Sequence, residues 1–264
     1  MIRNSFCILN GIGQKLERRL WSEGVLTWDD FLVAEAVGFI SPGRKRLMDD
    51  SLCLHREKLE YRDSSWLGQN IRGCEHWRLH SIFREHSVCL DIETNGYQPG
   101  AGGYVTMVGL YDGFDYRCLV RGENLSAETL ARALAPYKYL VTFYGSVFDV
   151  PYLKRALPGF DLNVPHFDLC FGAKKTGLKG GLKRIEAELG IERVEETRGM
   201  DGFDAVILWN EHRRGNPRAL ELLAKYNRED TVNLWSIADT IYSRLRECTG
   251  FDRYAQSRPA PALN

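Results

Sequence analysis

The 264-residue sequence has no apolar run close to the roughly 20 residues that a membrane-spanning helix requires. Its first residues, Met1 to Ser5, also lack the apolar centre of a secretion signal. These absences argue against an integral membrane protein built from spanning helices. We expect a cytoplasmic protein with no membrane contact.

Paired cysteines are missing too. Seven cysteines are scattered along the chain, an odd number with no Cys-x-x-Cys pair among them. This arrangement argues against a disulfide framework, and the spacing of cysteines and histidines fits no familiar zinc finger. We expect reduced thiols, most of them in the core.

An excess of charge of either sign is absent, since 35 basic side chains balance 35 acidic ones. A strongly basic surface is therefore excluded, and a nucleic-acid partner would have to be attracted by a local patch or by a bound metal ion. Residues 174–184 are the most basic stretch. They fit either a rim that binds a phosphate backbone or an ordinary solvated helix face.

Hydrophobic spacing divides the chain into parts. Residues 1–60 show helical spacing broken by glycine turns, which predicts a small all-helical module. Residues 61–80 are polar and lose this periodicity, so we predict a linker there. The main domain is predicted over residues 81–248, and the segment 249–264 is predicted to be a loose tail.

The main domain begins with strand-like segments. Strands are predicted at 87–93, 104–111 and 116–120, followed by a helix at 127–135 with Ser126 as its N-cap, and by strands at 139–144 and 164–169. Helices fill most of the remainder. This order predicts an α/β sandwich with a mixed sheet.

Acidic side chains occupy positions that usually face the core. Asp91 and Glu93 share one face of the first strand because side chains alternate along a strand. On the last long helix, about 218–245, Asp230 falls within an apolar stripe, and Tyr226 lies one turn before it. Asp149 follows the fourth strand at the start of a helix. Taken singly, these positions also fit a solvated strand edge or a helix cap.

Together, the four carboxylates predict a metal centre. Two like charges about 4 Å apart repel by roughly 4 kcal/mol at an effective dielectric constant of about 20, so clustered acids need cations. Oxygen ligands alone select hard divalent ions. We therefore expect Mg²⁺ or Mn²⁺ and chemistry on phosphate groups.

Three segments resemble the three motifs of the DEDD 3′–5′ exonucleases. They are Asp91-Ile92-Glu93-Thr94-Asn95-Gly96, Phe148-Asp149 and Tyr226-Asn227-Arg228-Glu229-Asp230. A tyrosine four residues before the last aspartate marks the DEDDy branch of that family. Residues 83–242 as a whole look like the YprB-like domain of the ribonuclease H superfamily.

The resemblance implies a ribonuclease-H-like fold, with a mixed five-stranded sheet flanked by helices, beside the small N-terminal all-helical domain. It also implies hydrolysis of a terminal phosphodiester by two metal ions. Asp91 would bridge both ions, and Glu93 and Asp230 would complete one site. Asp149 would hold the other ion through water. Tyr226, with an ordinary pKa of about 10, would orient the attacking water.

The resemblance also implies nucleic-acid contacts from Thr94 and Asn95. One departure stands out, because Tyr144-Gly145 lies where relatives often have Asn-Gly. A contact with the substrate strand is therefore expected to be absent or remodelled.

Residues 9–20 resemble the glycine-rich hairpin of helix-hairpin-helix modules. Gly11 and Gly13 would let the backbone approach a phosphate, and Lys15 would add positive charge. The same residues also fit a tight turn between helices, and many modules of this kind contact a protein partner instead.

The sequence predicts a metal-dependent 3′–5′ exonuclease that acts on single-stranded DNA or RNA ends. Two alternatives stay open, a structure-selective endonuclease of the same superfamily and a non-catalytic nucleic-acid-binding adaptor. The complete set of acids and tyrosine argues against the adaptor. The nuclease hypothesis requires that Asp230 lie beside Asp91 with room for an ion.

Overall fold

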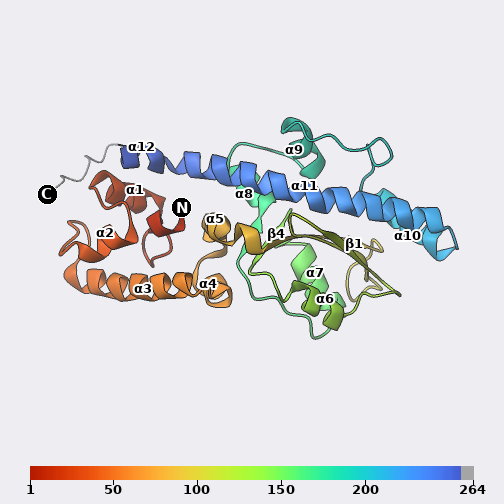
Figure 1. Cartoon of the computed structure of the whole chain (residues 1–264), viewed down its shortest axis with the longest axis horizontal. Helices are drawn as coiled ribbons and strands as arrows, with labels where there is room; N and C mark the ends of the chain where they lie inside the picture. Colours follow the sequence, from red (N-terminus) through yellow and green to blue (C-terminus); the bar gives the residue numbers. More distant parts are fainter. Residues whose placement is uncertain (257–264) are drawn as a thin grey trace.

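The N-terminal part of the chain is helical throughout. The computed structural model describes residues 1–256 and places this part at one end of an elongated molecule (Figure 1). Thr27 and Asp30 form a capping box at the start of α2, and a proline begins α3. The elements are η1 (Ile2–Asn4), α1 (Gln14–Ser22), α2 (Trp28–Val33), α3 (Pro42–Glu60), α4 (Ser64–Asn70), η2 (Gly73–Leu79), α5 (His80–Phe83) and η3 (Arg84–His86).

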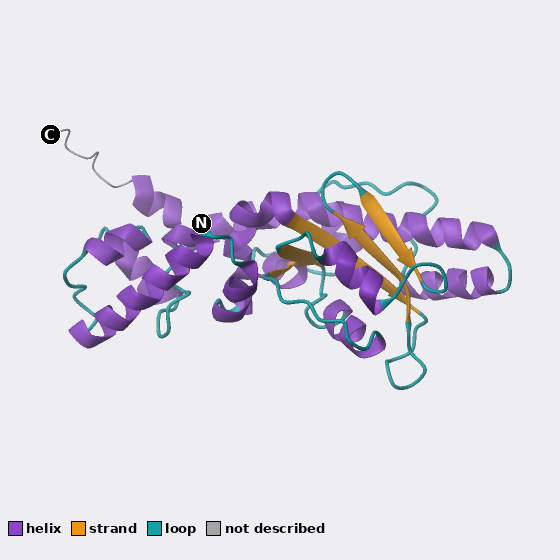
Figure 2. Cartoon of the chain, turned by 60° about the horizontal axis from the view of Figure 1, so that its bottom comes forward, coloured by secondary structure: helices purple, strands orange, loops and turns teal. Residues whose placement is uncertain are grey.

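A five-stranded sheet fills the other half of the molecule (Figure 2). Its strands are β1 (Ser87–Thr94), β2 (Val105–Tyr111), β3 (Tyr116–Val120), β4 (Tyr139–Thr142) and β5 (His166–Asp168). The spatial order is β3-β2-β1-β4-β5, with β1 antiparallel to β2 and parallel to β4. The predicted mixed sheet is confirmed, and β1 is its central strand.

Helices cover both faces of this sheet. Leu130 of α6 and Leu153 of α7 pack against Leu90 of β1 in one apolar cluster, while Leu234 and Ile237 of α11 pack with Cys89 in another. α11 runs along the length of the molecule (Figure 1). The helices are α6 (Ala127–Leu134), α7 (Asp149–Ala156), α8 (Leu169–Lys175), α9 (Leu182–Glu188), α10 (Gly202–Arg213), α11 (Pro217–Thr249) and α12 (Phe251–Gln256). Ser126 caps α6 with a capping box, as predicted.

Residues 61–80 are not an unstructured connection. They contain α4 and η2, and the Tyr139 hydroxyl of β4 donates a hydrogen bond to the His76 carbonyl of η2 at 2.8 Å. One apolar cluster runs from Phe6 through Leu79 to Ile241. The helical part and the sheet therefore share a core. Apolar residues of 61–80 lie in this core although they follow no regular period in the sequence.

The C-terminal segment also differs from the expected loose tail. α11 continues to Thr249, and α12 follows after Gly250, which adopts a left-handed conformation with φ +76°. The ring of Phe251 packs 5.2 Å from the ring of Trp21 in α1. The remainder of the predicted tail, residues 257–264, lies outside the described residues.

Within residues 1–256, no helix combines the length and the apolar character needed to cross a bilayer. All seven cysteines fall in this range, but only Cys7 and Cys89 are buried, and Cys53, Cys74 and Cys248 are exposed. The expectation that most of them lie in the core is therefore wrong.

Candidate metal and active site

Three carboxylates meet between the central strand and the long helix. Asp91 and Glu93 project from β1, and Asp230 projects from α11. Each offers an oxygen, and these oxygens lie within 4.8 Å of one another. The predicted convergence of residues more than a hundred positions apart is thus present in the fold.

Close packing of α11 on β2 brings the helix to the strand. Gly109 of β2 pairs with Asp91, and a Cβ atom added at Gly109 would come within 2.0 Å of the Asn227 Oδ1 atom. The missing side chain therefore admits Asn227, whose amide donates to Asp91 at 2.8 Å and to Glu93 at 3.4 Å. Any larger residue at position 109 would push α11 away from the acids.

Asp149 stands beside this group rather than in it. It begins α7, where a helix start tolerates an acidic side chain, and its Oδ1 accepts a hydrogen bond from the Ile92 amide at 3.2 Å. The carboxylate still contributes to the raised pKa of Asp91. The group of oxygens within 4.8 Å of one another does not include Asp149, and its expected role in holding a second ion through water stays a prediction.

Burial and mutual repulsion hold protons on these acids. Burial, with the charges of Glu93 and Asp230, raises the pKa of Asp91 well above its usual value. Burial and the nearby Asp230 raise the pKa of Glu93 to about 8, and burial raises the pKa of Asp149 to about 7. A bound cation would offset both the cost of burying these negative charges and the repulsion between them, so such a group of carboxylates favours a cation.

Two basic side chains enter the site from the segment around α9. The Lys183 ammonium donates to the Tyr226 hydroxyl at 2.7 Å. Arg193 donates from Nη2 to Asp230 Oδ1, while Glu186 binds its guanidinium through two contacts of 2.7 Å. Arg193 therefore neutralises one oxygen of Asp230, although burial still raises the pKa of that carboxyl.

Of Lys183 and Arg193, only Lys183 belongs to a segment that the sequence had singled out. Lys183 belongs to the basic stretch 174–184, which suggested a phosphate-binding rim rather than a partner for Tyr226. Arg193 carried no signal, because its place depends on Glu186, which is buried on α9. Asn227 lies inside the third motif, but only the packing at Gly109 reveals its hydrogen bonds.

Tyr226 corrects one assumption of the sequence analysis. It is buried, and burial together with the charges of Asp230, Glu93 and Asp91 raises its pKa above the ordinary value of about 10. The phenol is therefore protonated at neutral pH. Its role in orienting a water molecule stays a prediction.

The acids line a cavity of about 330 Å³. Thr94 lines it, together with Tyr97 and Phe148. The Asn95 side chain instead closes the 95–104 loop, donating to the Gly102 carbonyl at 2.9 Å and accepting from the Tyr104 amide at 2.9 Å. Thr94 and Asn95 were the residues predicted to contact nucleic acid, and of these two only Thr94 lines the cavity.

The glycine-rich segment lies away from the acids. Gly11 is left-handed, with φ +79°, and Gly13 is the N-cap of α1. Lys15 is exposed on that helix. α1 and β1 lie toward opposite ends of the molecule (Figure 1), so Gly11, Gly13 and Lys15 do not join this site, and their contact with nucleic acid stays a prediction.

The donor set fits a hard divalent cation. It consists of carboxylate oxygens next to an open cavity, and within residues 1–256 no cationic side chain makes a hydrogen bond to Asp91 or Glu93. Such oxygens are ligands for Mg²⁺ and Mn²⁺. Asp91, Glu93 and Asp230 could hold one ion directly.

Comparison with known proteins places the central part of the chain in a family. A model described as RNase_H superfamily matches residues 88–242. No curated protein sequence matches the chain significantly.

Solved structures with a similar fold are distant in sequence. The structure of Brucella melitensis NrnC bound to pGG has 18% identity and a TM-score of 0.48, covering 67% of this chain and 81% of that one. Brucella melitensis NrnC with bound Mg²⁺ has 18% identity and a TM-score of 0.47, covering 67% and 85%. The catalytic core of RRP6 from Trypanosoma brucei has 16% identity and a TM-score of 0.45, covering 69% and 48%.

Proposed function

The chain belongs to the RNase_H superfamily, and from this premise we propose that it is a metal-dependent 3′–5′ exonuclease of single-stranded DNA or RNA ends. The proposal includes the DEDDy assignment and the YprB-like relationship suggested by the motifs. The main support for it is the convergence of Asp91, Glu93 and Asp230. Tyr226 lies on α11 one helical turn before Asp230.

Asp91, Glu93 and Asp230 would hold one Mg²⁺ or Mn²⁺ ion, and Asp91 with Asp149 would hold a second. Such ions supply a water of lowered pKa and stabilise charge on the leaving oxygen. Asn227 fixes the rotamers of Asp91 and Glu93 by donating to both carboxylates.

Tyr226 would act at the position of the attacking water. Its hydroxyl accepts a hydrogen bond from Lys183, which leaves its own proton free to be donated. Because its pKa is raised, the phenol keeps that proton at neutral pH. A fixed donor of this kind can orient water without serving as a base.

The test follows labelled oligonucleotides of DNA and RNA, marked at either end, with Mg²⁺, Mn²⁺ or chelator. We expect stepwise shortening from the 3′ end that needs metal and disappears in Asp91→Asn and Asp230→Asn. Asp115→Asn, an exposed carboxylate in the turn after β2, is the matched control and should shorten the strand normally. Cleavage of closed single-stranded circles would reject end dependence in favour of an endonuclease.

Two further proposals concern the rest of the chain. We retain residues 81–248 as the catalytic domain, and residues 9–20 as a docking segment for nucleic acid or a protein partner. Removal of residues 1–60 would not test this cleanly, because that part shares its core with the sheet. Replacing exposed Lys15 by Gln leaves the core intact and should lower affinity for nucleic acid if the segment contacts phosphate.

A further inference from the structure

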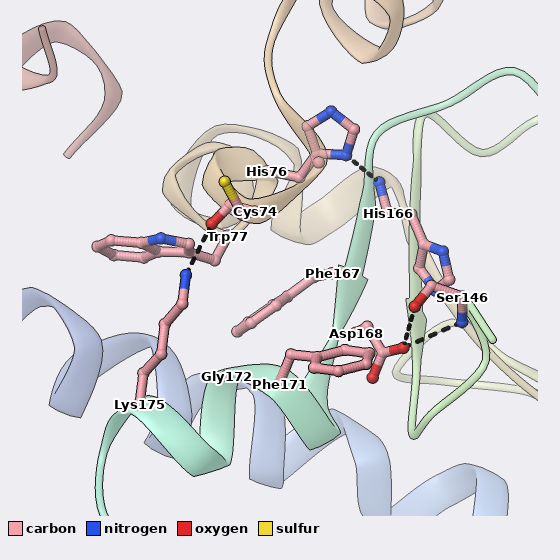
Figure 3. Close-up of a pocket in the computed structure, with 11 residues that line it drawn as sticks. Cys74, His76, Trp77, Ser146, His166, Phe167, Asp168, Phe171, Gly172 and Lys175 are labelled. Atoms are coloured by element: carbon pink, nitrogen blue, oxygen red, sulfur yellow. Dashed lines mark hydrogen bonds between the residues drawn. The ribbon is translucent and has the colours of Figure 1, made fainter. Parts of the chain in front are cut away.

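A second cavity, of about 410 Å³, lies between η2, β5 and α8. Its size is within the range of about 300–1,000 Å³ typical of small-molecule sites. Figure 3 shows the rings of Trp77, Phe167 and Phe171 around it, with Lys175 at one side. The cavity contains none of the residues assigned above to metal binding or catalysis.

The polar groups of this cavity are almost all occupied within the protein. Asp168 accepts hydrogen bonds from the amide and the hydroxyl of Ser146 (Figure 3). It also accepts from the Tyr144 amide, and it caps α8 through the Cys170 amide. No carboxylate oxygen there lacks a hydrogen-bond donor. What faces a ligand is therefore aromatic surface and the ammonium group of Lys175, which donates to the Cys74 carbonyl at 3.0 Å.

One loop connects this cavity with the acidic cavity. Ser146 lines the aromatic cavity, and Phe148, two residues later, lines the acidic one. The loop is held in an unusual conformation, because Tyr144 has φ +65°, which is costly for an aromatic residue. The centres of the Tyr144 and Phe171 rings lie 6.1 Å apart, and these residues are 45% and 41% exposed.

The surroundings favour an anionic ligand with an aromatic ring. Lys175 at the end of α8 lines the cavity, and Lys174 and Lys179 are near it in the sequence. Stacking on exposed rings beside positive charge is how proteins bind bases of a single strand without reading their sequence. A nucleotide satisfies both features, since its base is flat and its phosphate is negative.

We propose that this aromatic cavity binds a base of the single strand whose 3′ end lies among Asp91, Glu93 and Asp230. The inference rests on the proposed nuclease function and adds a subsite to it. Phe171 stacks on the base, with Tyr144 extending the stacking surface toward Phe148. Lys175 contacts the adjoining phosphate.

The experiment measures how much affinity is gained by lengthening the strand. Dissociation constants for two-residue and ten-residue oligothymidylates are measured with Mg²⁺ in an Asp91→Asn background, so that the strand is not shortened. Because stacking on one ring contributes severalfold to more than a hundredfold in affinity, Phe171→Ala should reduce the ratio of the two constants by about tenfold. Phe114→Ala removes an exposed ring from the β2–β3 turn and should keep the ratio of the parent chain.

A second variant separates charge from stacking. Lys175→Gln should lower the slope of log affinity against log salt by about 1, as expected for one phosphate contact, whereas Phe171→Ala should leave the slope unchanged. Far-UV circular dichroism checks that both variants are folded. Photo-crosslinking of a 5-iodouracil-containing strand should label peptides within 73–77 or 166–175.

The outcomes distinguish this inference from the function on which it rests. Metal-dependent shortening by the unaltered chain, with a length ratio that Phe171→Ala does not change, would overturn the subsite alone. Absence of any metal-dependent hydrolysis would overturn the proposed function and the subsite with it. Crosslinks confined to peptides outside the cavity would also reject the subsite.

Discussion

Two regions of the molecule bury carboxylates close together, and they neutralise them differently. In the N-terminal part, Arg78 donates from Nη2 to Glu17 at 2.8 Å and from Nε to Glu75 at 2.6 Å. The second oxygen of Glu17 accepts from the amides of Phe6 and Cys7. One arginine and several backbone donors thus satisfy both acids.

The acidic site has the opposite balance. Asp91 and Glu93 receive hydrogen bonds from the neutral Asn227 amide, and of the three clustered carboxylates Arg193 contacts Asp230 alone. The pKa of Glu93 is consequently raised to about 8, by burial first and then by Asp230. Buried acids with complete partners are costly to disrupt from one side, whereas buried acids short of positive charge indicate a place for a cation.

The largest expected effect comes from Asp91→Asn. Losing a bridging ligand should lower metal-dependent hydrolysis by about a thousandfold or more, that is about 4 kcal/mol in activation free energy. The same change replaces a carboxyl group whose ionisation is opposed by burial and by its acidic neighbours with a neutral amide, so the metal-free chain should become more stable by about 1 kcal/mol. Oligonucleotide kinetics and thermal unfolding in chelator measure the two effects. A less stable metal-free variant would contradict the proposed imbalance of charge.

Glu17→Gln should act in the other direction on stability. It leaves the guanidinium of Arg78 with a single buried carboxylate, and breaking a buried ion pair from one side costs about 3 kcal/mol or more. Urea unfolding measures the loss. Glu23→Gln, which removes an exposed partner of Arg19 from the end of α1, should change stability by less than about 1 kcal/mol. Equal losses of unfolding free energy in the two variants would mean that the buried ion pair of Glu17 and Arg78 contributes no more to stability than an exposed one.

The contrast also explains how much of the site was predictable from sequence. Alternation along β1 put Asp91 and Glu93 on one face, and a separation of four residues put Tyr226 beside Asp230. Both inferences use local periodicity, which a single sequence contains. The mixed sheet followed from the order of the strands, and the structure confirms it.

The parts that sequence did not predict depend on packing between distant segments. Arg193 joins Asp230 only because Glu186 anchors it, and Asn227 reaches the acids only because Gly109 lacks a side chain. The segment 61–80 looked like a linker because its polar residues hid the packing of η2 on the sheet. Contacts between distant segments leave no periodic pattern in the sequence, so they could not be predicted from it.

The stability of the metal-free chain should depend on pH in a defined direction. The pKa of Glu93 is about 8 in the folded chain against a usual 4.5, so the folded state binds its proton more tightly than the unfolded state does. Its contribution to stability is complete below pH 4.5 and is lost as the pH rises to about 8. We expect the urea midpoint in chelator to fall between pH 5 and pH 8.5.

Saturating Mg²⁺ should remove most of that decline, since an ion bound to the folded state stabilises it by about 3 kcal/mol at one hundred times its dissociation constant. The comparison is made at one ionic strength, with Ca²⁺-free buffer and chelator as the reference. A midpoint that rises with pH in the metal-free chain, or that Mg²⁺ does not shift at pH 8.5, would contradict a cation site at Glu93.

The smallest expected effect concerns Arg193, the one cationic side chain that contacts the three-carboxylate group within residues 1–256. Its charge opposes a divalent ion at Asp230, so Arg193→Gln should tighten Mn²⁺ binding by about fivefold, equivalent to about 1 kcal/mol. Arg193→Lys retains the charge and is the matched control, with affinity close to that of the parent chain. Titration calorimetry measures both.

The direction of this change decides what Arg193 does. If the guanidinium mainly orients Asp230, the glutamine variant loses that support and binds Mn²⁺ more weakly. If it mainly supplies charge, the variant binds more tightly and its metal-free form is less stable, because Glu186 is then buried without a cation. Tighter binding together with lower stability is expected, since the two contacts to Glu186 already fix the guanidinium independently of Asp230. Arg193 would then neutralise Asp230 in the metal-free chain, as Arg78 neutralises Glu17 and Glu75. Unlike Arg78, it would be replaced in that role by a bound metal ion.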